Sequence, residues 1–308
     1  MPEISVVVPT YNRLETLAPV LPTLLAQDLA PSEFEVLVCD SNSTDGTAEF
    51  LAKMRAGHPN VRYLPGAYSG RAAARNAGID AAQGEVVLFN DSDIFASPDL
   101  LSHHLRHHRA QRKIAVVGLE VQVKDFDDYL FKRDHPEERG SLHKPTRKTL
   151  PWLYFLTGNA SVRREDLLRV GRFDESFTGY GHEDLELGYR LERAGVTILY
   201  EPNAINYHCQ DVPHDDQKEK MRLAGRSTVR FYRKHPEFAV QLNLGMTPVS
   251  LGLHSVLERV PGLLAFFDAR SSRSKFARDL VQQYHYVSGV KDALRQAQDK
   301  PEKEQRVG

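Results

Sequence analysis

Short apolar runs alternate with amphipathic stretches along the N-terminal third of the chain. The β-branched run of residues 4–8, "ISVVV", ends at Pro9 and predicts a buried strand. Residues 14–27 then place leucines at the three- and four-residue spacing of a helix. A strand followed by a helix is therefore the first repeat of the pattern.

The same alternation continues to the run that ends at Phe89. The segments "FEVLVCD", "VRYLP" and "EVVLF" predict three more strands, and helical patterns at residues 47–56 and 70–84 separate them. Alternating strands and helices predict an α/β fold, with a mostly parallel sheet and helices on both of its faces. This is a Rossmann-like arrangement.

Polar residues cluster where three of these strands end. They are Thr10–Asn12 after the first strand, Asp40–Asp45 after the second and Asp91–Asp93 after the fourth. In open α/β sheets the ligand crevice lies outside the carboxyl ends of the strands, so we expect the three clusters to form one site.

Two acids at the end of the fourth strand, Asp91 and Asp93, raise the question of a metal. Carboxylate oxygens are suitable ligands for Mg²⁺ or Mn²⁺, which could neutralise a diphosphate. The alternative is that both acids are turn and helix-capping residues. The chain has no G-x-G-x-x-G after the first strand and no Walker A loop, so another element must hold any phosphate.

A second acidic pair, Glu183 and Asp184, lies at the predicted start of the helix "EDLELGYRLERA". Acids at a helix start also favour the positive end of the helix dipole, which is the simpler explanation of their position. The segment "HHLRHHR" at residues 103–109 has zinc-like histidine spacing, but its arginines favour a solvated helix face.

Composition limits the class of protein. The chain has 308 residues, 41% hydrophobic and 26% charged, which fits one large globular domain or a domain with an appendage. Its formal net charge is −1, so we expect no nucleic-acid partner. Cys39 and Cys209 cannot build a disulfide framework, and the N-terminus has no signal-peptide pattern. We expect a cytoplasmic protein.

Six sequence blocks in order resemble those of the family 2 glycosyltransferases, which have the GT-A fold. The blocks are "VVVPTYNR", "EVLVCDSNSTDGT", "GRAAARNAGIDAAQGEVVLFNDSD", "TGNASVRREDLLRVGRFDESF", "GHEDLELGYRLERAG" and, further on, His208. The resemblance covers roughly residues 3–210, and it is the order of the blocks that makes it specific.

The resemblance implies roles for individual residues. The nucleotide and substrate would be bound by Pro9, Tyr11, Asp40, Arg71, Asp91 and Glu183, and the divalent cation, Mn²⁺ or Mg²⁺, by Asp93 and His208. Asp184 would be the catalytic base. One departure from the family pattern is Ile94, which stands where an additional acid is common. His208 also has a simpler interpretation as a hydrogen-bonded structural histidine.

The resemblance predicts an inverting transferase that moves a sugar from a nucleoside-diphosphate sugar to a hydroxyl. Asp40 favours a UDP- or dTDP-type donor over GDP, since a carboxylate can accept from a uracil or thymine N–H. The acceptor would be a glycan or a lipid-linked molecule, in polysaccharide, glycolipid or cell-envelope glycan synthesis. A nucleotidyltransferase and a noncatalytic sugar-nucleotide-binding protein are the alternatives.

The expected domain boundaries follow from where the family resemblance ends. We expect a GT-A catalytic domain at 1–215, divided into a nucleotide-binding half at 1–95 and an acceptor half at 96–215. Residues 216–308 would form a helical extension with a disordered tail, "QDKPEKEQRVG". The charged segment 120–150 is expected to be a mobile acceptor loop.

The apolar segment "VPGLLAFF" lies close to four basic residues, Arg270, Arg273, Lys275 and Arg278. It predicts peripheral contact with the inner face of a membrane, packing in a core, or a homodimer contact. The segment is too short to span a bilayer.

Overall fold

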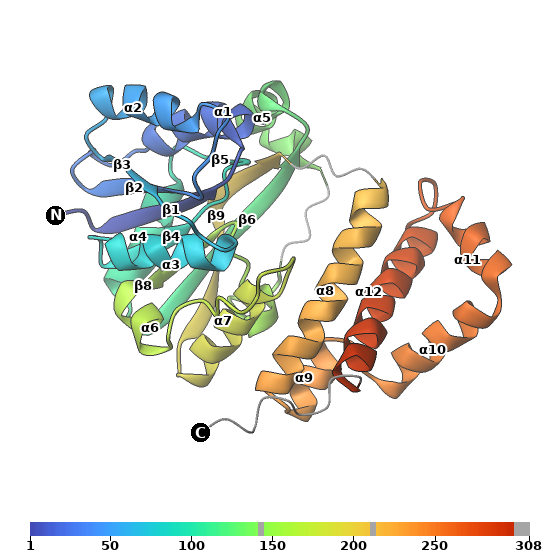
Figure 1. Ribbon diagram of the computed structural model, residues 1–308. Helices are drawn as coiled ribbons and strands as arrows, with labels where there is room; N and C mark the ends of the chain where they lie inside the picture. Colours follow the sequence, from blue (N-terminus) through green and yellow to red (C-terminus); the bar gives the residue numbers. More distant parts are fainter. Residues whose placement is uncertain (141–144, 210–213, 299–308) are drawn as a thin grey trace. The chain divides into compact units, whose positions relative to one another are not determined.

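The computed structural model describes residues 1–140, 145–209 and 214–298 (Figure 1). Two compact units can be distinguished in the chain. The first comprises Met1–Thr178 and Glu183–Asp211, and the second comprises Gly179–His182 and Val212–Gly308.

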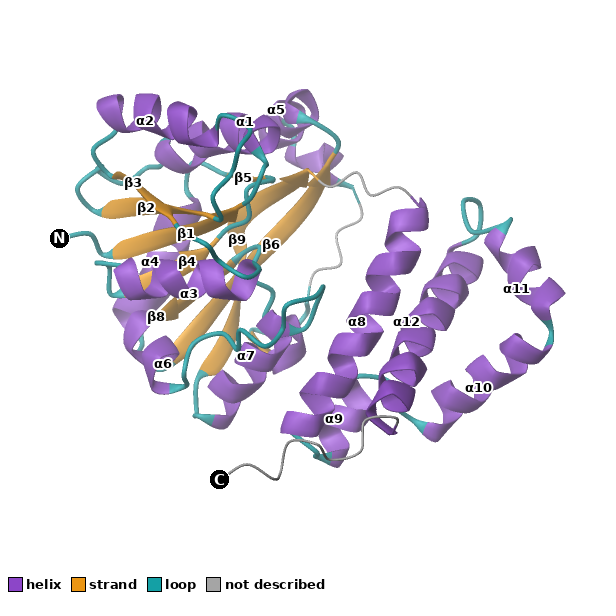
Figure 2. Ribbon diagram, in the orientation of Figure 1, coloured by secondary structure: helices purple, strands orange, loops and turns teal. Residues whose placement is uncertain are grey.

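The first unit is built on one mixed sheet, drawn in orange in Figure 2. The strand order is β3-β2-β1-β4-β8-β6-β9-β5, with β7 paired to β9. The strands are β1 (Ile4–Thr10), β2 (Phe34–Asp40), β3 (Val61–Pro65), β4 (Val86–Phe89), β5 (Ile94–Ala96), β6 (Ile114–Val123), β7 (Thr149–Leu150), β8 (Ala160–Arg163) and β9 (Thr197–Cys209). Strands β1 to β4 pair in parallel, whereas β8 is antiparallel to both of its neighbours.

Helices cover both faces of the sheet, and they bury its central strands on both sides. Every residue of β1 and β2 is buried. On one face, Val6 and Val8 belong to the core cluster that includes Leu17, Leu21 and Leu105. The opposite face of β1 carries Val7, which packs under Gly78.

The helices of this unit follow the predicted alternation. They are α1 (Leu14–Leu25), α2 (Thr47–Gly57), α3 (Arg71–Ala81), α4 (Leu100–Ala110), α5 (Phe126–Asp134), α6 (Arg164–Arg169) and α7 (Glu183–Arg193), with short 3-10 turns η1 (Pro136–Arg139) and η2 (Trp152–Tyr154). The predicted α/β architecture is therefore confirmed.

Two local expectations are wrong. Segment 120–150 is not one long loop, because its described part contains the end of β6, helix α5, turn η1 and strand β7. The predicted solvated face of α4 carries two buried histidines, His104 and His108, which both hydrogen-bond to the Ser161 hydroxyl at 2.8 Å. Burial lowers the pKa of His104 to about 4 and that of His108 to about 3, so both are neutral core residues.

The second unit is helical, as the sequence predicts. Its helices are α8 (His214–Lys234), α9 (Phe238–Asn243), α10 (Pro248–Arg259), α11 (Pro261–Asp268) and α12 (Lys275–Gln298). Glycines allow α8 and α12 to approach closely, since a Cβ at Gly225 would lie 1.9 Å from the Tyr286 carbonyl oxygen. No helix in the described part of the chain is both long and apolar enough to cross a bilayer. The predicted disordered tail lies outside the described residues, apart from Gln298.

Candidate active site

A cavity of about 640 Å³ opens where β1, β2 and β4 end. Its walls come from the segments that follow these strands and from the start of α3. The lining residues are Pro9, Thr10, Tyr11, Arg13, Ser41, Asn42, Ala67, Tyr68, Ser69, Gly70, Arg71, Ala74, Asp91, Ser92 and Asp93. The three predicted polar clusters therefore do meet, because parallel strands carry their carboxyl ends to the same edge of the sheet.

The turn after β4 fixes the positions of Asp91 and Asp93. The Asn90 side-chain amide donates to the carbonyl oxygens of Asp91 and Ile94, at 2.9 Å each. The carbonyl of Asp93 accepts from the Cys209 backbone N–H at 2.9 Å. Both acids are thus held between the end of the parallel sheet and strand β9.

Helix α3 supplies two guanidinium groups that connect the acidic pairs. Arg75 is fully buried and donates to Asp91 at 2.7 Å and to Glu183 at 3.2 Å. Arg71, one turn earlier, lies 3.2 Å from the same Glu183 oxygen. Burial alone would raise the pKa of Asp91, but Arg75 and Arg71 hold that pKa below its ordinary value. Asp91 is therefore ionised beside the cavity.

Asp184 has a different electrostatic environment from its neighbour Glu183. Burial and the charge of Glu183 raise the pKa of Asp184 to about 6, against the opposing charges of Arg75 and Arg71. Arg75 interacts with Asp91, Glu183 and Asp184, so one acid of the first predicted pair and both acids of the second lie around one guanidinium. A carboxyl group with a pKa near neutrality is suited to accept a proton during catalysis.

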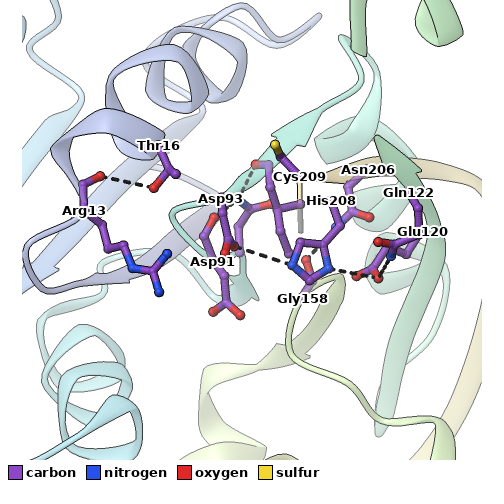
Figure 3. A network of polar contacts seen from close by, with 12 residues as sticks. Arg13, Thr16, Asp91, Asp93, Glu120, Gln122, Gly158, Asn206, His208 and Cys209 are labelled. Atoms are coloured by element: carbon purple, nitrogen blue, oxygen red, sulfur yellow. Dashed lines mark hydrogen bonds and ion pairs between the residues drawn. The ribbon is translucent and has the colours of Figure 1, made fainter. Parts of the chain in front are cut away.

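His208 lies beside Asp93 because of strand pairing. Ile94 of β5 pairs with His208 of β9. The His208 Nε2 atom is 3.7 Å from an Asp93 oxygen, and Nδ1 is 3.1 Å from a Glu120 oxygen (Figure 3). Burial and the charge of Asp91 raise the pKa of Asp93. Burial by itself would lower the pKa of His208, but Glu120, Asp93 and Asp91 together raise that pKa above its ordinary value.

Asp93 and His208 fit a divalent cation as a two-residue donor set. Imidazole and carboxylate both suit Mn²⁺, and a separation of 3.7 Å is too long for a hydrogen bond between the facing atoms. Within the described residues no group of three or more His, Cys, Asp or Glu side chains is arranged to hold a metal. The remaining ligands would have to come from the substrate and water.

Asp40 does not line the cavity. Its side chain is completely buried, and it accepts hydrogen bonds from the Ser43 hydroxyl at 2.5 Å and the Tyr63 hydroxyl at 2.9 Å. Because both carboxylate oxygens are engaged, this geometry argues against direct contact between Asp40 and a base. Ser41 and Asn42 reach the cavity instead.

Residues 5–171, more than half of the chain, match the family model "Glycosyl transferase family 2". The chain belongs to glycosyl transferase family 2. Residues 141–214 also match the model "N-terminal domain of galactosyltransferase". Validoxylamine A glucosyltransferase from Streptomyces hygroscopicus subsp. limoneus is 30% identical over 275 residues, which cover 80% of this chain and 60% of that protein. The chain spans 60–64% of the length of the curated relatives that match it at this level.

Two solved structures share the fold at low sequence identity. Mannosyltransferase PcManGT from Pyrobaculum calidifontis, in complex with GDP-Man and Mn²⁺, has a TM-score of 0.65 and 21% identity, covering 95% of this chain and 87% of its own. TarS 1–349 from S. aureus, in complex with UDP, has a TM-score of 0.57 and 21% identity, covering 97% and 92%. These likenesses support the GT-A fold predicted for this family 2 chain.

Three charged residues of this family 2 site were not predicted from the sequence. They are Arg13, which lines the cavity, Arg75 and Glu120. Arg75 follows Arg71 by four residues, and that spacing on a predicted helix signals a shared face. For Glu120 the signal is weaker, because only the alternation of polar residues at the end of β6 distinguishes it.

Proposed function

We propose that the protein is an inverting, metal-dependent glycosyltransferase that uses a nucleoside-diphosphate sugar. The observation that carries the proposal is Arg75, which connects the Asp91 side of the cavity with Glu183 and Asp184. Family 2 membership supports the reaction class. The cavity and the acids around Arg75 supply groups for binding the donor and for accepting the acceptor's proton.

The cavity has the chemistry to bind a nucleoside diphosphate. Arg13 and Arg71 supply positive charge to its walls, and a guanidinium can bind phosphate oxygens through several N–H groups. Tyr11, whose side chain is 61% exposed, and Tyr68 offer aromatic surfaces to a base. In this arrangement Asp40 supports the base pocket indirectly, by holding the loop that carries Ser41 and Asn42.

Asp93 and His208 would hold the divalent cation, Mn²⁺ or Mg²⁺. When bound, the cation would neutralise the negative charge that develops on the diphosphate leaving group. Asp91, kept ionised by Arg75, would lie near the donor ribose and sugar, with Glu183 held by the same arginine.

Asp184 acts as the general base in this proposal. Its carboxylate takes the proton from the acceptor hydroxyl while the hydroxyl oxygen bonds to the anomeric carbon. The bond from that carbon to the diphosphate oxygen breaks at the same time, and its electron pair leaves with the diphosphate. Attack from the face opposite the leaving group inverts the anomeric configuration.

The donor is tested by incubating the protein with UDP-, dTDP- and GDP-sugars, with and without Mn²⁺. We expect saturable binding of a nucleotide sugar and slow release of the nucleoside diphosphate, both lost when a chelator is added. The predicted preference for a UDP- or dTDP-sugar no longer follows from Asp40, which does not line the cavity, so this assay decides the base. Release of pyrophosphate would instead indicate a nucleotidyltransferase. Binding without turnover in the presence of glycan and lipid-linked acceptors would indicate a noncatalytic binding protein.

The proposal assigns donor binding and acceptor binding to different halves of the catalytic domain at 1–215. Every residue that lines the cavity lies between Pro9 and Asp93, which supports donor binding by residues 1–95. Residues 96–215 would then supply the acceptor side, including Asp184.

Peripheral attachment to an anionic membrane is proposed for the second unit. The rings of Phe266, Phe267 and Phe276 form a contiguous cluster, with Phe266 and Phe276 48% and 68% exposed. Arg270 stacks on Phe266 at 3.6 Å, and Arg273, Lys275 and Arg278 are exposed nearby in the sequence. Exposed aromatic residues beside basic ones fit an anionic bilayer surface.

Vesicle sedimentation tests the membrane attachment, which would bring a lipid-linked acceptor to a protein at the cytoplasmic face. We expect the chain to sediment with phosphatidylglycerol vesicles but not with phosphatidylcholine vesicles. Replacing Phe266 and Phe276 by Ser should abolish sedimentation. Equal sedimentation of this variant would contradict the proposal, whereas a shift from dimer to monomer would assign the cluster to a homodimer contact.

A further inference from the structure

Glu120 lies on the opposite side of the His208 ring from Asp93 (Figure 3). Its Oε1 atom is 3.1 Å from Nδ1 of the histidine, while Nε2 faces Asp93 at 3.7 Å. We propose that Glu120 is a positioning residue that fixes the orientation and tautomer of His208 for binding the divalent cation. This inference rests on the metal-binding role proposed above for Asp93 and His208.

Strand pairing brings Glu120 to the histidine. Strands β6 and β9 run in parallel, with Glu120 paired to Asn206 and Gln122 paired to His208. Because side chains alternate along a strand, Glu120 and Gln122 project from the same face of β6. Both are exposed, whereas the intervening Val121 is buried. The carboxylate therefore lies beside the ring without lining the cavity.

Hydrogen-bond chemistry then determines which ring nitrogen is available. An ionised carboxylate can only accept, so the contact with Glu120 requires a hydrogen on Nδ1. In a neutral imidazole this leaves the lone pair on Nε2, the atom that faces Asp93. The Nε2 lone pair and the Asp93 oxygen face each other across 3.7 Å, and either a proton or a divalent cation can be shared between them. Glu120 thus selects the tautomer that can bind a metal.

Glu120 is itself held in place by neighbouring groups. The Gln122 side-chain amide donates to its Oε1 atom at 2.8 Å. Gly158 gives its other oxygen room, since a Cβ at that position would lie 3.0 Å from Oε2. The carbonyl of Gly158 accepts from the Asn206 amide at 2.6 Å, which ties this loop to β9. Carboxylates that orient a metal-bound histidine are typically held by such contacts.

The test measures Mn²⁺ affinity of the full chain, from the free Mn²⁺ signal in electron paramagnetic resonance. We expect Glu120→Ala to weaken Mn²⁺ binding by about 10- to 100-fold, and Glu120→Gln, which can still accept from Nδ1, to weaken it less. The double variant Glu120→Ala/His208→Ala should bind no more weakly than His208→Ala, because Glu120 acts through the histidine. Glu165→Ala, which removes an exposed acid on α6, should leave the affinity unchanged.

A second readout does not depend on the metal. Nitrogen-15 spectra of the histidine rings, recorded where His208 is neutral, should show its hydrogen on Nδ1 in the native chain and a shift toward Nε2 in Glu120→Ala. Native Mn²⁺ affinity in Glu120→Ala, together with weak binding in His208→Ala, would overturn this inference alone. Native affinity in His208→Ala would instead overturn the proposed metal role on which it rests.

Discussion

Neighbouring acids in the sequence have different environments in the fold. Glu183 is buried, and its Oε1 atom lies 3.2 Å from both Arg71 and Arg75. Asp184 makes no such close pair with a guanidinium of the described residues, and burial beside Glu183 raises its pKa to about 6. The same two-residue motif therefore supplies one carboxylate that pairs with two guanidiniums and one carboxyl group that can exchange a proton near neutral pH.

The pH dependence of transfer follows from the raised pKa of Asp184. A general base must be ionised, so activity should fall about tenfold per pH unit below about pH 6 and level off above it. Asp184→Asn cannot accept the proton and should lose ~10²- to 10⁴-fold in rate while binding the donor normally. Rates of sugar transfer across pH and donor titrations measure both effects. Near-native turnover by this variant would remove Asp184 from the role of base.

Arg75 is expected to support stability as well as the site. Arg75→Met would leave Asp91 and Glu183 without their buried partner, at a cost of about 3–5 kcal/mol in the free energy of unfolding. Arg172→Met, which breaks an exposed pair with Asp80, is the matched control and should cost about 0–1 kcal/mol. Urea unfolding monitored by circular dichroism gives both values. Equal losses would show that the buried pairs contribute no more than a surface pair.

At the scale of elements, helix α3 is the part that links the sheet to the site. It carries Arg71 and Arg75 on one side and packs through Gly78 against β1 and β2. A Cβ at Gly78 would lie 2.4 Å from a Val7 methyl and 3.0 Å from the Cys39 sulfur. The absence of a side chain therefore sets how closely the helix, and both guanidiniums, approach the strands.

Gly78→Ala tests this packing. The added methyl must displace either Val7 or the helix, so we expect a loss of about 1–3 kcal/mol in unfolding free energy and weaker donor binding. Gly57→Ala, at the end of α2 with open space around it, should be neutral or stabilise by up to about 1 kcal/mol. Thermal unfolding and donor titration report the two quantities. Unchanged donor affinity in a destabilised Gly78→Ala variant would show that α3 keeps its position.

At the scale of the whole molecule, the chain forms one unit built on a sheet with helices and a second unit built of helices. All residues that line the cavity lie in the first unit. In the second unit, α8 and α12 approach so closely that a Cβ at Gly289 would lie 1.9 Å from the Arg222 carbonyl oxygen. A defect placed between these two helices should therefore affect the second unit first.

Gly289→Ala provides that defect. We expect faster hydrogen exchange in α8 and α12, with nucleotide-sugar binding retained, because the lining residues that the structure describes all lie outside these helices. Gly252→Ala in α10, where a Cβ meets nothing within 4 Å, should leave exchange unchanged or slower. Loss of nucleotide binding in parallel with the faster exchange would show that the site depends on the second unit.

The fold of the first unit was predictable because the hydrophobic pattern that specifies its strands and helices is local and repeats along the chain. The apolar runs and leucine spacing predicted β1 to β4 and the helices between them nearly residue by residue. The meeting of the polar clusters also followed from the sequence, because parallel strands end at the same edge of a sheet. Segment 120–150 was mispredicted because its strands and helix are short, charged and stabilised by tertiary pairing.

By itself, the sequence determined the alternating architecture and the edge of the sheet where the polar clusters meet, and it singled out the two acidic pairs, Asp91 with Asp93 and Glu183 with Asp184. Only the tertiary structure decided how these acids differ: Asp40 is buried, Asp91 and Glu183 share Arg75, and Glu120 on strand β6 reaches His208 on the neighbouring strand β9. The physical reason is that hydrogen-bond partners and burial depend on contacts between segments far apart in the chain. Side-chain periodicity carries no information about those contacts.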